Sequence, residues 1–491
     1  MRGHDKLAAA IALALLVVVT SGTAFAQTDP AVAPPDNTTT APNASDAQLQ
    51  QQPPLLINYT VGLGFEHSDN IGLTQDNRES QNLLTPNLTF MLDKGGSRVQ
   101  AYAAGQIQYV DFLEGAFVNE VRGQFTGALN WVMAPDLLSF SMVDTSGVQP
   151  VQTRVQYAPN NLQQVNVFSA GPTLNLRLNP VTRVQGELLY TNTLASKTEY
   201  FDSQRGALVA RLIRDLSPTS QLTFTAESNF VDPRQTNVIV NSFAAPSYTN
   251  YRAYGNYRSL LANLTLDVTA GWVDYQFHQD APSRNGAFGN VAISWQMTPR
   301  SSLGFGAGHQ FGDAASEIAT DLGALNANPN APRSLGSVLP PDTIPNIFRN
   351  TGSGLAVGSS IVTSQVFEEN QASLSYEFKG EKYGFVISPF YRRQHYLNDP
   401  SLDIRYLGTS GGVTYRVNPL LTFGFSMERD QIKYLNPIGH DTYMSYGPNV
   451  VHELTPHWSW QASLTHDQRR SDSSGHDYSE NAIYFAILWT R

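Results

Sequence analysis

Long runs in which large apolar residues alternate with small or polar ones dominate the chain, and they come in pairs joined at a proline. The clearest pair lies in Thr414–Asp430, where Tyr415 and Val417 alternate with polar residues before Pro419. The sequence Leu-Thr-Phe-Gly-Phe-Ser-Met continues the alternation after it. Side chains of a strand point alternately to its two faces, and proline lacks the N–H that a ladder needs. This stretch predicts two antiparallel strands joined at a proline-containing turn.

The same strand–proline–strand unit recurs at Pro135, Pro180, Pro218, Pro299 and Pro456. With Pro419 included, the spacings are 180−135 = 45, 218−180 = 38, 299−218 = 81, 419−299 = 120 and 456−419 = 37. A repeat of about forty residues also occurs in propellers and helical arrays. A propeller blade, however, needs four short strands in that length, and helices lack the period-2 alternation. Two long strands per repeat, with alternating short and long connections, predict an all-β fold: a transmembrane antiparallel up-and-down β-barrel.

The tight turns fix the expected number of strands. Where the repeat skips a proline, we expect turns at Asp93–Gly96, Asn256–Ser259 and Lys379–Lys382. The turns then fall near residues 95, 135, 180, 218, 258, 299, 380, 419 and 456. Nine turns and ten longer loops predict about 20 strands (about 18–22), since boundaries inferred this way are uncertain by several residues. An even number of strands keeps both ends of the chain on the periplasmic side.

Aromatic residues near the turns give an independent indication of a membrane barrel. Trp131, Trp295 and Tyr415 each lie four residues before a turn proline and share the apolar parity of their strands. Trp458 lies just after Pro456 on the same parity. Outward aromatic residues at this level are typical of an interfacial belt. The alternative, core aromatics of a soluble sandwich, requires several domains of shorter strands, and no linker divides residues 55–491.

The N-terminal residues indicate export. Arg2 and Lys6 precede the apolar run Leu7–Thr20, and Ala24-Phe25-Ala26 fits a cleavage site, so residues 1–26 are predicted to be a cleaved signal peptide. Residues 27–54 are rich in Pro, Thr, Ala and Gln and are predicted to be a disordered periplasmic linker. Residues 55–491 then form the barrel. No later segment reaches the length of apolar sequence that a transmembrane helix needs.

Composition excludes several classes of protein. Only 15% of residues are charged, which is low for a soluble protein and agrees with strands that expose one face to lipid. The formal net charge of −10 argues against a nucleic-acid partner. Cysteine is absent, which excludes thiol catalysis and cysteine metal sites. Histidines His457, His466 and His476 lack metal-ligand spacing, and no nucleophile elbow or phosphate loop occurs. We expect no catalytic residues, no cofactor and no metal.

One connection differs from the others. Gly312–Thr363 spans about fifty residues, rich in Ala, Asn, Pro and Ser, and lacks the alternation of a strand. Connections this long are usually functional or disordered. By alternation of sides it is extracellular. It either folds into the lumen as a constriction or covers the mouth of the barrel.

The lumen-facing parity carries the candidate functional residues. Five arginines fall within a few residues of short turns, and three glutamates share the inward parity: Arg98, Arg177, Arg183, Arg300 and Arg416, with Glu187, Glu227 and Glu428. A ring of arginines near the periplasmic mouth would favour anions such as acidic sugars. Alternatively, these charges pair across neighbouring strands and stabilise the wall. The inward residues Gln100, Tyr102, Gln106 and Gln108 are candidates for a sugar-binding track.

The opening strand resembles that of a known family. Val61-Gly62-Leu63-Gly64-Phe65-Glu66-His67-Ser68-Asp69-Asn70-Ile71 is similar to the first strand of the β-barrel porin 2 family, a Gly/aromatic strand that runs into an Asp-Asn-Ile step. The strand–proline–strand joints along residues 57–490 also resemble that family. The resemblance implies an outer-membrane barrel linked to exopolysaccharide production or export, including systems associated with exosortase. It implies no catalytic residues.

Together these observations predict a porin-like outer-membrane channel for hydrophilic solutes, linked by the resemblance to exopolysaccharide export. The alternative is a structural or adhesive surface barrel that acts through its extracellular loops. The expected partners are outer-membrane lipid, the barrel-assembly machinery, which reads an aromatic residue near the C-terminus such as Trp489, and polysaccharide or its export machinery. We expect no nucleic-acid partner.

Overall fold

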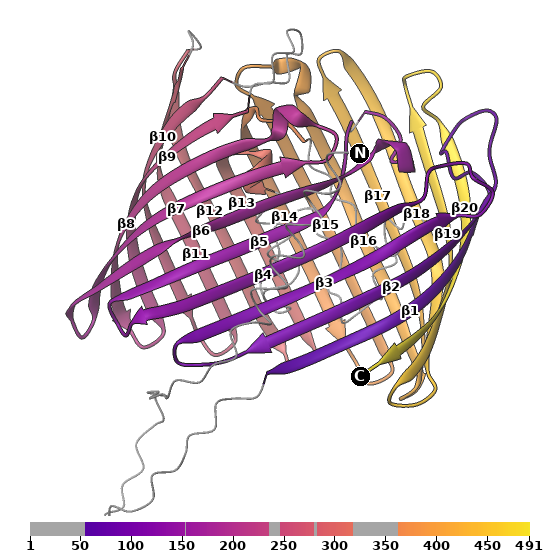
Figure 1. Cartoon of the computed structure of the whole chain (residues 1–491), viewed down its shortest axis with the longest axis horizontal. Coiled ribbons are helices and arrows are strands. Elements are labelled where there is room, and N and C mark those ends of the chain that lie inside the picture. The colour runs from indigo at the N-terminus through magenta and orange to yellow at the C-terminus, as the bar shows by residue number, and fades with distance from the viewer. Residues whose placement is uncertain (1–54, 153, 235–245, 279–281, 318–361) are drawn as a thin grey trace, which may run out of the picture.

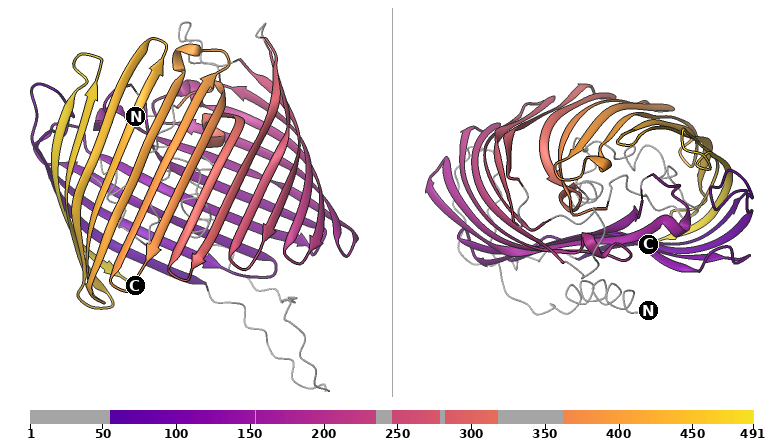
Figure 2. Two further views of the ribbon diagram at one scale, coloured as in Figure 1. Left: turned by 180° about the vertical axis from the view of Figure 1, so that it is seen from behind. Right: turned by 90° about the horizontal axis from the view of Figure 1, so that it is seen from above.

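Twenty antiparallel β-strands form one sheet that closes on itself in the computed structural model (Figure 1). Each strand pairs with its neighbours in the chain, and the first strand pairs with the last from Thr60–Thr490 to Ser68–Ala482. The predicted fold class, an up-and-down barrel of about 20 strands, is confirmed. Seen from above, the barrel is elongated rather than round (Figure 2).

The strands are long, as the sequence predicts. Their bounds are β1 Leu56–Ser68, β2 Gln81–Lys94, β3 Val99–Phe112, β4 Glu120–Ala134, β5 Leu138–Pro150, β6 Leu162–Asn179, β7 Thr182–Ala195, β8 Ser203–Ser217, β9 Ser220–Pro233, β10 Tyr248–Leu260, β11 Leu264–Phe277, β12 Arg284–Thr298, β13 Ser301–Asp313, β14 Val366–Lys379, β15 Tyr383–Tyr396, β16 Ile404–Asn418, β17 Leu421–Leu435, β18 Ile438–Glu453, β19 Trp458–Ser471 and β20 Tyr478–Thr490. Short 3₁₀ turns occur at η1 Pro159–Asn161, η2 Glu199–Phe201 and η3 Pro400–Leu402.

The structure describes residues 55–152, 154–234, 246–278, 282–317 and 362–491. The predicted signal peptide (1–26) and linker (27–54) lie outside the described residues, as does most of the long connection Gly312–Thr363. Within the described ranges, no helix has the length and hydropathy to cross a membrane.

Nine tight turns lie at one end of the barrel together with the start of β1 and the end of β20, as predicted. The turn expected at Asn256–Ser259 is wrong, because β10 continues to Leu260 and the chain turns at 261–263. Asn256 is a ladder residue whose Nδ2 donates to Asp267 Oδ1 on β11 at 2.7 Å. Asparagine is common in turns, but the Asn256 side chain forms a hydrogen bond on the lumen face of the sheet.

The opposite end carries ten connections, and one of them is not long. β17 and β18 are joined by Asn436 and Pro437 alone, across a cis peptide bond. The expectation that every connection at this end is a longer loop is therefore wrong at this position. We call the two ends the short-turn end and the long-loop end.

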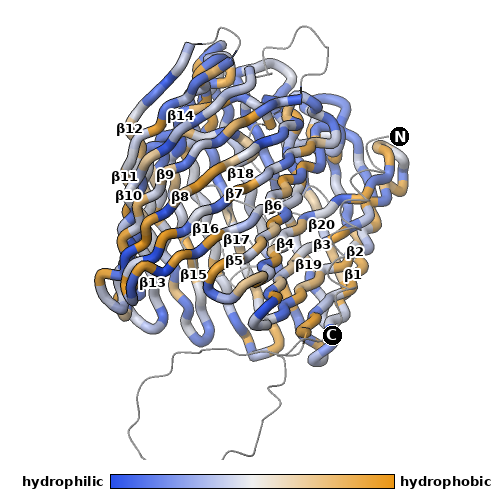
Figure 3. Tube along the Cα trace, turned by 60° about the vertical axis from the view of Figure 1, so that its left-hand side comes forward, coloured by the Kyte–Doolittle hydropathy of each residue, from blue (hydrophilic) through white to orange (hydrophobic). Residues whose placement is uncertain are grey.

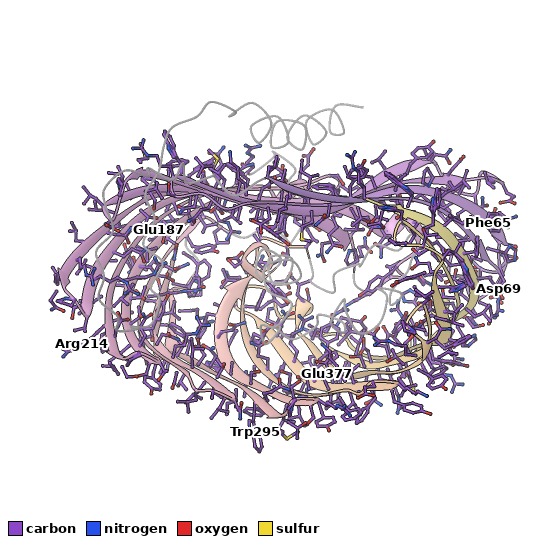
Figure 4. All side chains as sticks on the ribbon, turned by 90° about the horizontal axis from the view of Figure 1, so that it is seen from below. Phe65, Asp69, Glu187, Arg214, Trp295 and Glu377 are labelled. Atoms are coloured by element: carbon purple, nitrogen blue, oxygen red, sulfur yellow. The ribbon has the colours of Figure 1, made fainter. Side chains whose placement is uncertain are left out.

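The two faces of the wall differ as the alternation predicts. Leu188 and Leu208 are paired on β7 and β8 and are 56% and 57% exposed, so the outside of the barrel is apolar. Apolar and polar positions alternate along the strands in Figure 3. Viewed from below, Trp295 and Arg214 project outward, and Glu187 and Glu377 lie on the inner side (Figure 4).

Outward aromatic residues form a belt at each end of this apolar surface. The predicted residues Trp131, Trp295, Tyr415 and Trp458 are all exposed near the short-turn end. A second set lies toward the long-loop end and includes Phe65, Tyr109, Tyr190, Phe230, Tyr251 and Trp272.

The spacing of the two belts matches a bilayer. Trp131 pairs with Val99, and Tyr109 lies 109−99 = 10 residues further along β3. Ten strand residues span about 33 Å, and a tilt of about 40° leaves about 25 Å along the barrel axis, the height of the apolar band in membrane barrels.

The stability cost of an introduced charge should distinguish the lipid-facing side of the wall from the lumen-facing side. Leu188→Arg places an arginine against lipid and should lower the free energy of unfolding by about 2–4 kcal/mol in lipid vesicles. Gln106→Arg, on the inward parity of β3, should cost much less because its side chain meets a polar lumen. Urea titrations, read out by the shift in gel mobility on heating, measure the free energy of unfolding of both variants. Equal losses of unfolding free energy would contradict this assignment of the faces.

Candidate functional site in the barrel lumen

The predicted lumen arginines all lie at the short-turn end. Arg177 and Arg416 are near the ends of β6 and β16, and Arg183 is near the start of β7. Arg98 and Arg300 occupy turns rather than strands, so strand parity does not set their direction. Arg177 and Arg183 are directly opposite each other in the β6–β7 ladder.

Several of the predicted charges pair across strands. Arg183 Nη1 lies 3.2 Å from Asp215 Oδ2, and Arg300 Nη2 lies 2.6 Å from Glu381 Oε1. Two glutamates bind arginines that the sequence analysis did not single out: Glu187 binds Arg211 at 2.7 Å and Glu227 binds Arg252 at 3.6 Å. Among the described residues, Arg98, Arg177 and Arg416 form no salt bridge.

Glu428 lies in a different place, on an inner acidic row toward the long-loop end. The register runs from Glu428 to Ser445, from Ser445 to Asp467 and from Asp467 to Glu480. The three carboxylates are buried, at 3%, 9% and 7% exposure. Hydroxyl groups contribute to the row, since Tyr443 donates to Asp467 at 3.1 Å and Ser68 donates to Glu480.

The upper end of β13 leaves the wall and enters the lumen. β12 and β13 pair only between Gly289–His309 and Thr298–Ser301, whereas β13 stays paired with β14 as far as Asp313. The freed end packs against the inner faces of β9 to β11. Buried residues hold it there: Val231, Tyr248, Val273, Tyr275, Phe277, Phe311 and Val366. Figure 2 shows this part of the sheet inside the barrel outline when seen from above.

A buried ion pair fixes the inward end of β13. Asp313 lies 2.9 Å from Arg205 Nη1 of β8, and the Tyr248 hydroxyl donates to Asp313 Oδ2 at 3.1 Å. The side chains of Asp313 and Arg205 are 7% and 14% exposed. Arg252 Nη2 adds a hydrogen bond to the Phe311 carbonyl at 2.9 Å. Because one strand end is tied to a strand five positions away in the barrel, the contact divides the lumen at this level.

The residues that follow β13 extend the division. A helical turn at 314–317 begins at Asp313, whose Oδ1 accepts from the Ala315 and Ser316 N–H groups at 3.1 Å. Its apolar side packs against the inner face of β6 and against η2. The cluster comprises Val165, Val167, Phe201, Ala314, Ala315 and Val362. On its other side, Glu317 binds Arg392 of β15 at 2.5 Å.

These contacts bear on the long connection. The sequence left open whether it enters the lumen or covers the mouth. Its described ends, 314–317 and 362–365, are packed inside the barrel.

Phe201, which packs against Ala314 and Ala315, belongs to the β7–β8 connection. In the same connection, burial raises the pKa of the Asp202 carboxyl, which accepts a hydrogen bond from the Ala195 N–H at 2.9 Å.

A second segment, the 151–161 connection between β5 and β6, also reaches across the lumen. Arg154 Nη2 donates to the Ser401 carbonyl at 2.7 Å and to the Asn436 carbonyl at 3.0 Å. Its guanidinium lies over the Tyr434 ring, 4.6 Å from the centroid. Arg469 of β19 completes the junction by donating to the Arg154 carbonyl at 2.7 Å. One arginine therefore joins the β5–β6 side of the barrel to β17, to the β15–β16 connection and to the β17–β18 connection.

A small cavity of about 30 Å³ is lined in part by Tyr157 of this segment. Its lining is rich in tyrosine and aspartate: Tyr157, Tyr406, Asp430, Asp441, Tyr443 and Tyr478, with Arg469 and Ile432. Arg469 Nη2 binds Asp441 Oδ2 at 2.6 Å, and the Tyr434 hydroxyl donates to the same oxygen at 2.9 Å. These groups bind one another, so the residues around the cavity hold the crossing segment in place. In the described chain, no group of three or more possible ligands is placed to hold a metal ion.

The sequence analysis missed Arg154, Arg205 and Asp313, which carry these crossings. Parity assigns a side chain to a face but does not show that a strand end or a loop turns inward. One signal was present: Val-Gln-Thr-Arg-Val-Gln-Tyr at 151–157 continues the apolar–polar alternation beyond β5. That pattern suits a segment with one packed side.

Comparisons with solved structures find other barrels at low similarity. The FrpB iron transporter from Neisseria meningitidis (F5-1 variant) has a TM-score of 0.44 and 9% identity, covering 88% of this chain and 82% of that chain. The siderophore receptor PirA from Pseudomonas aeruginosa has a TM-score of 0.41 and 10% identity, covering 90% and 81%. The copper transporter OprC has a TM-score of 0.41 and 9% identity, covering 89% and 80%. No family model and no curated protein matches the chain.

Breaking the Arg205–Asp313 pair should loosen the inward end of β13. Removing one partner of a buried ion pair costs about 3–5 kcal/mol, so Arg205→Gln should lower the free energy of unfolding in lipid vesicles by about that much. Arg183→Gln is the matched control, because its pair with Asp215 is 43% and 37% exposed and contributes little. Urea titration measures both variants, and equal losses of unfolding free energy would contradict a structural role for the buried pair.

Releasing the 151–161 segment should expose Tyr157. Arg154→Gln removes a cation–π contact and two charge-assisted hydrogen bonds, so chymotrypsin should cleave after Tyr157 at least about 10-fold faster, since hydrogen bonds to charged groups contribute about 1.5–3 kcal/mol each. Arg78→Gln removes a single loop hydrogen bond to Ser479 and serves as the control. An unchanged cleavage rate in Arg154→Gln would show that other contacts hold the segment.

Proposed function

We propose that the chain forms a channel for hydrophilic solutes across the bacterial outer membrane, with the two inward segments limiting flow. The observation that carries the proposal is a closed wall, apolar outside and polar inside, whose lumen is crossed by tethered segments. Two aromatic belts about 25 Å apart suit a bilayer. The expected signal peptide, cleaved near Ala26, supports export to that membrane.

The distribution of charge along the lumen supports a channel whose selectivity differs between its two ends. Arg177 and Arg416, on the inward parity of β6 and β16, lie at the short-turn end and form no salt bridge among the described residues. The acidic row with Glu428 and Asp467 lies toward the other end. Rings of arginine favour anions and rings of carboxylates favour cations. We infer that the short-turn mouth attracts anionic solutes and that the narrowed region selects by size.

The finer proposal is that the solute is a saccharide handled by an exopolysaccharide export system. It is supported by the resemblance of Val61–Ile71 to the β-barrel porin 2 family and by amides on the inward parity of β3. Gln106 faces Gln124 and Gln108 faces Arg122 in the β3–β4 register. Amide and guanidinium groups hydrogen-bond well to sugar hydroxyls and carboxylates.

Single-channel recording of the full chain in a planar bilayer tests both levels of the proposal. We expect steady conductance steps that acidic oligosaccharides block more strongly than neutral ones of equal length. Arg177→Gln with Arg416→Gln should weaken the block by acidic sugars and leave the neutral block unchanged. Because the chain lacks cysteine, a disulfide between position 314 or 315 and Val165 or Val167 can lock the inward segment, and conductance should rise when it is reduced.

The alternative function predicts a different result. A structural or adhesive surface barrel would fold, shift on heating in a gel and remain closed. Absence of conductance in the wild type and in the double variant Arg154→Gln/Arg205→Gln would overturn the channel and favour action through the loops.

A further inference from the structure

The outer surface of the barrel carries a row of basic side chains that the channel does not use. On neighbouring strands, Arg393 of β15 faces Arg405 of β16, Arg405 faces Lys433 of β17, and Lys433 faces His440 of β18. We call Arg393, Arg405 and Lys433 the outer basic row. Arg429 and Arg470 flank it on β17 and β19.

The strand pattern places the row on the outside. Arg393 shares the parity of Phe385 and Ile387, which are 40% and 49% exposed, and Lys433 shares that of Phe425. Arg393 and Lys433 are themselves exposed, and Arg405 is half-buried between them. The strands concerned form one continuous part of the wall, orange to yellow in Figure 2.

Like charges directly opposite one another on neighbouring strands are destabilising, and no carboxylate in the described part of the chain forms an ion pair with them. In the described ranges, none of the three residues forms a salt bridge, and Arg405 Nε has no hydrogen-bond partner. The nearby carboxylates are placed against histidines instead, with Glu368 3.8 Å from His309 and Asp403 2.7 Å from His395.

The row lies at the level of lipid headgroups. Tyr383 belongs to the belt at the short-turn end, where its ring stacks on Tyr415. Arg393 lies 393−383 = 10 residues further along β15. That separation is about 25 Å along the barrel axis after allowing for strand tilt. The row therefore lies where the apolar band ends on the extracellular side.

The rest of the circumference differs at this level. Toward the long-loop end, the outward parity of β3, β9 and β11 carries Asp111, Asp232 and Asp274. Positive charge is concentrated on β15 to β19, so it is not a general anchoring girdle. A localised row of this kind suits a localised anionic ligand.

We propose that the outer basic row binds the phosphate groups of a phosphorylated glycolipid in the outer leaflet. Guanidinium groups bind phosphate oxygens through paired hydrogen bonds, and one lipid with two phosphates can neutralise three adjacent cations. Its acyl chains would lie along apolar residues below, such as Leu407, which is 53% exposed. The inference rests on the proposed membrane placement, but not on solute passage.

Binding of bisphosphorylated lipid A to the purified full chain in maltoside micelles containing EDTA tests the proposal. The triple variant Arg393→Gln/Arg405→Gln/Lys433→Gln should bind about 100-fold more weakly, since each basic residue near an anionic lipid surface contributes about a fivefold step. Wild-type binding should weaken steeply with added salt. Arg214→Gln, an outward arginine at the short-turn end, is the matched control and should bind like the wild type.

Three outcomes would overturn the proposal. They are equal affinity in the triple variant, equal affinity for dephosphorylated lipid A, and full competition by 10 mM inorganic phosphate, roughly the concentration at which a simple anion site would fill. Gel mobility on heating verifies that the triple variant is folded. Lipid binding without conductance would reject the channel and leave this inference standing, and conductance with unchanged lipid binding in the triple variant would do the reverse.

Discussion

The requirement that every backbone N–H and C=O group be paired at membrane depth governs this structure. Lipid offers no hydrogen-bond partners, so a sheet can cross a bilayer only if it has no edge. Pairing of β1 with β20 removes the edge. An early end of the ladder lies between β12 and β13, above Gly289. Ala287, just beyond it, pairs with Trp272 of the long-loop belt. The unpaired segment therefore starts at the interface, where water can satisfy it.

That break is what allows the lumen to be divided. A strand kept in the ladder along its whole length cannot carry a side chain to the opposite wall. Once β13 is released above Gly289, Asp313 can reach Arg205 and the apolar residues around Tyr275 can pack on the inner wall. The Arg154 junction achieves the same result with a loop. In both cases an arginine binds groups that would otherwise be desolvated without partners, which makes each crossing specific to one geometry.

The sequence predicted the fold closely because its signals were local. Alternation assigned the faces, and the prolines marked most turns, so 20 strands followed. Asn256 failed as a turn marker because its amide serves Asp267 across the ladder, and this pairing between strands cannot be recognised from residue type. Asn436 and Pro437 form a tight turn where a loop was expected, since Pro indicates a turn but does not say at which end. The arginine contacts that hold the lumen crossings, Arg205 with Asp313 and Arg154 with Ser401, join residues more than a hundred positions apart, and alternation along a strand does not show which partners meet.

Charge is distributed differently on the two faces, and the solvent of each face explains why. Inside, carboxylates and arginines share water and one another, so Glu187 and Glu227 are matched by Arg211 and Arg252. Outside, at the end of the apolar band, a side chain meets only lipid headgroups and water. An outward row of unmatched cations is costly to assemble unless the leaflet supplies the anion. The stability of β15 to β18 should therefore depend on the lipid around the barrel, whereas that of β7 to β10, with their internal ion pairs, should not.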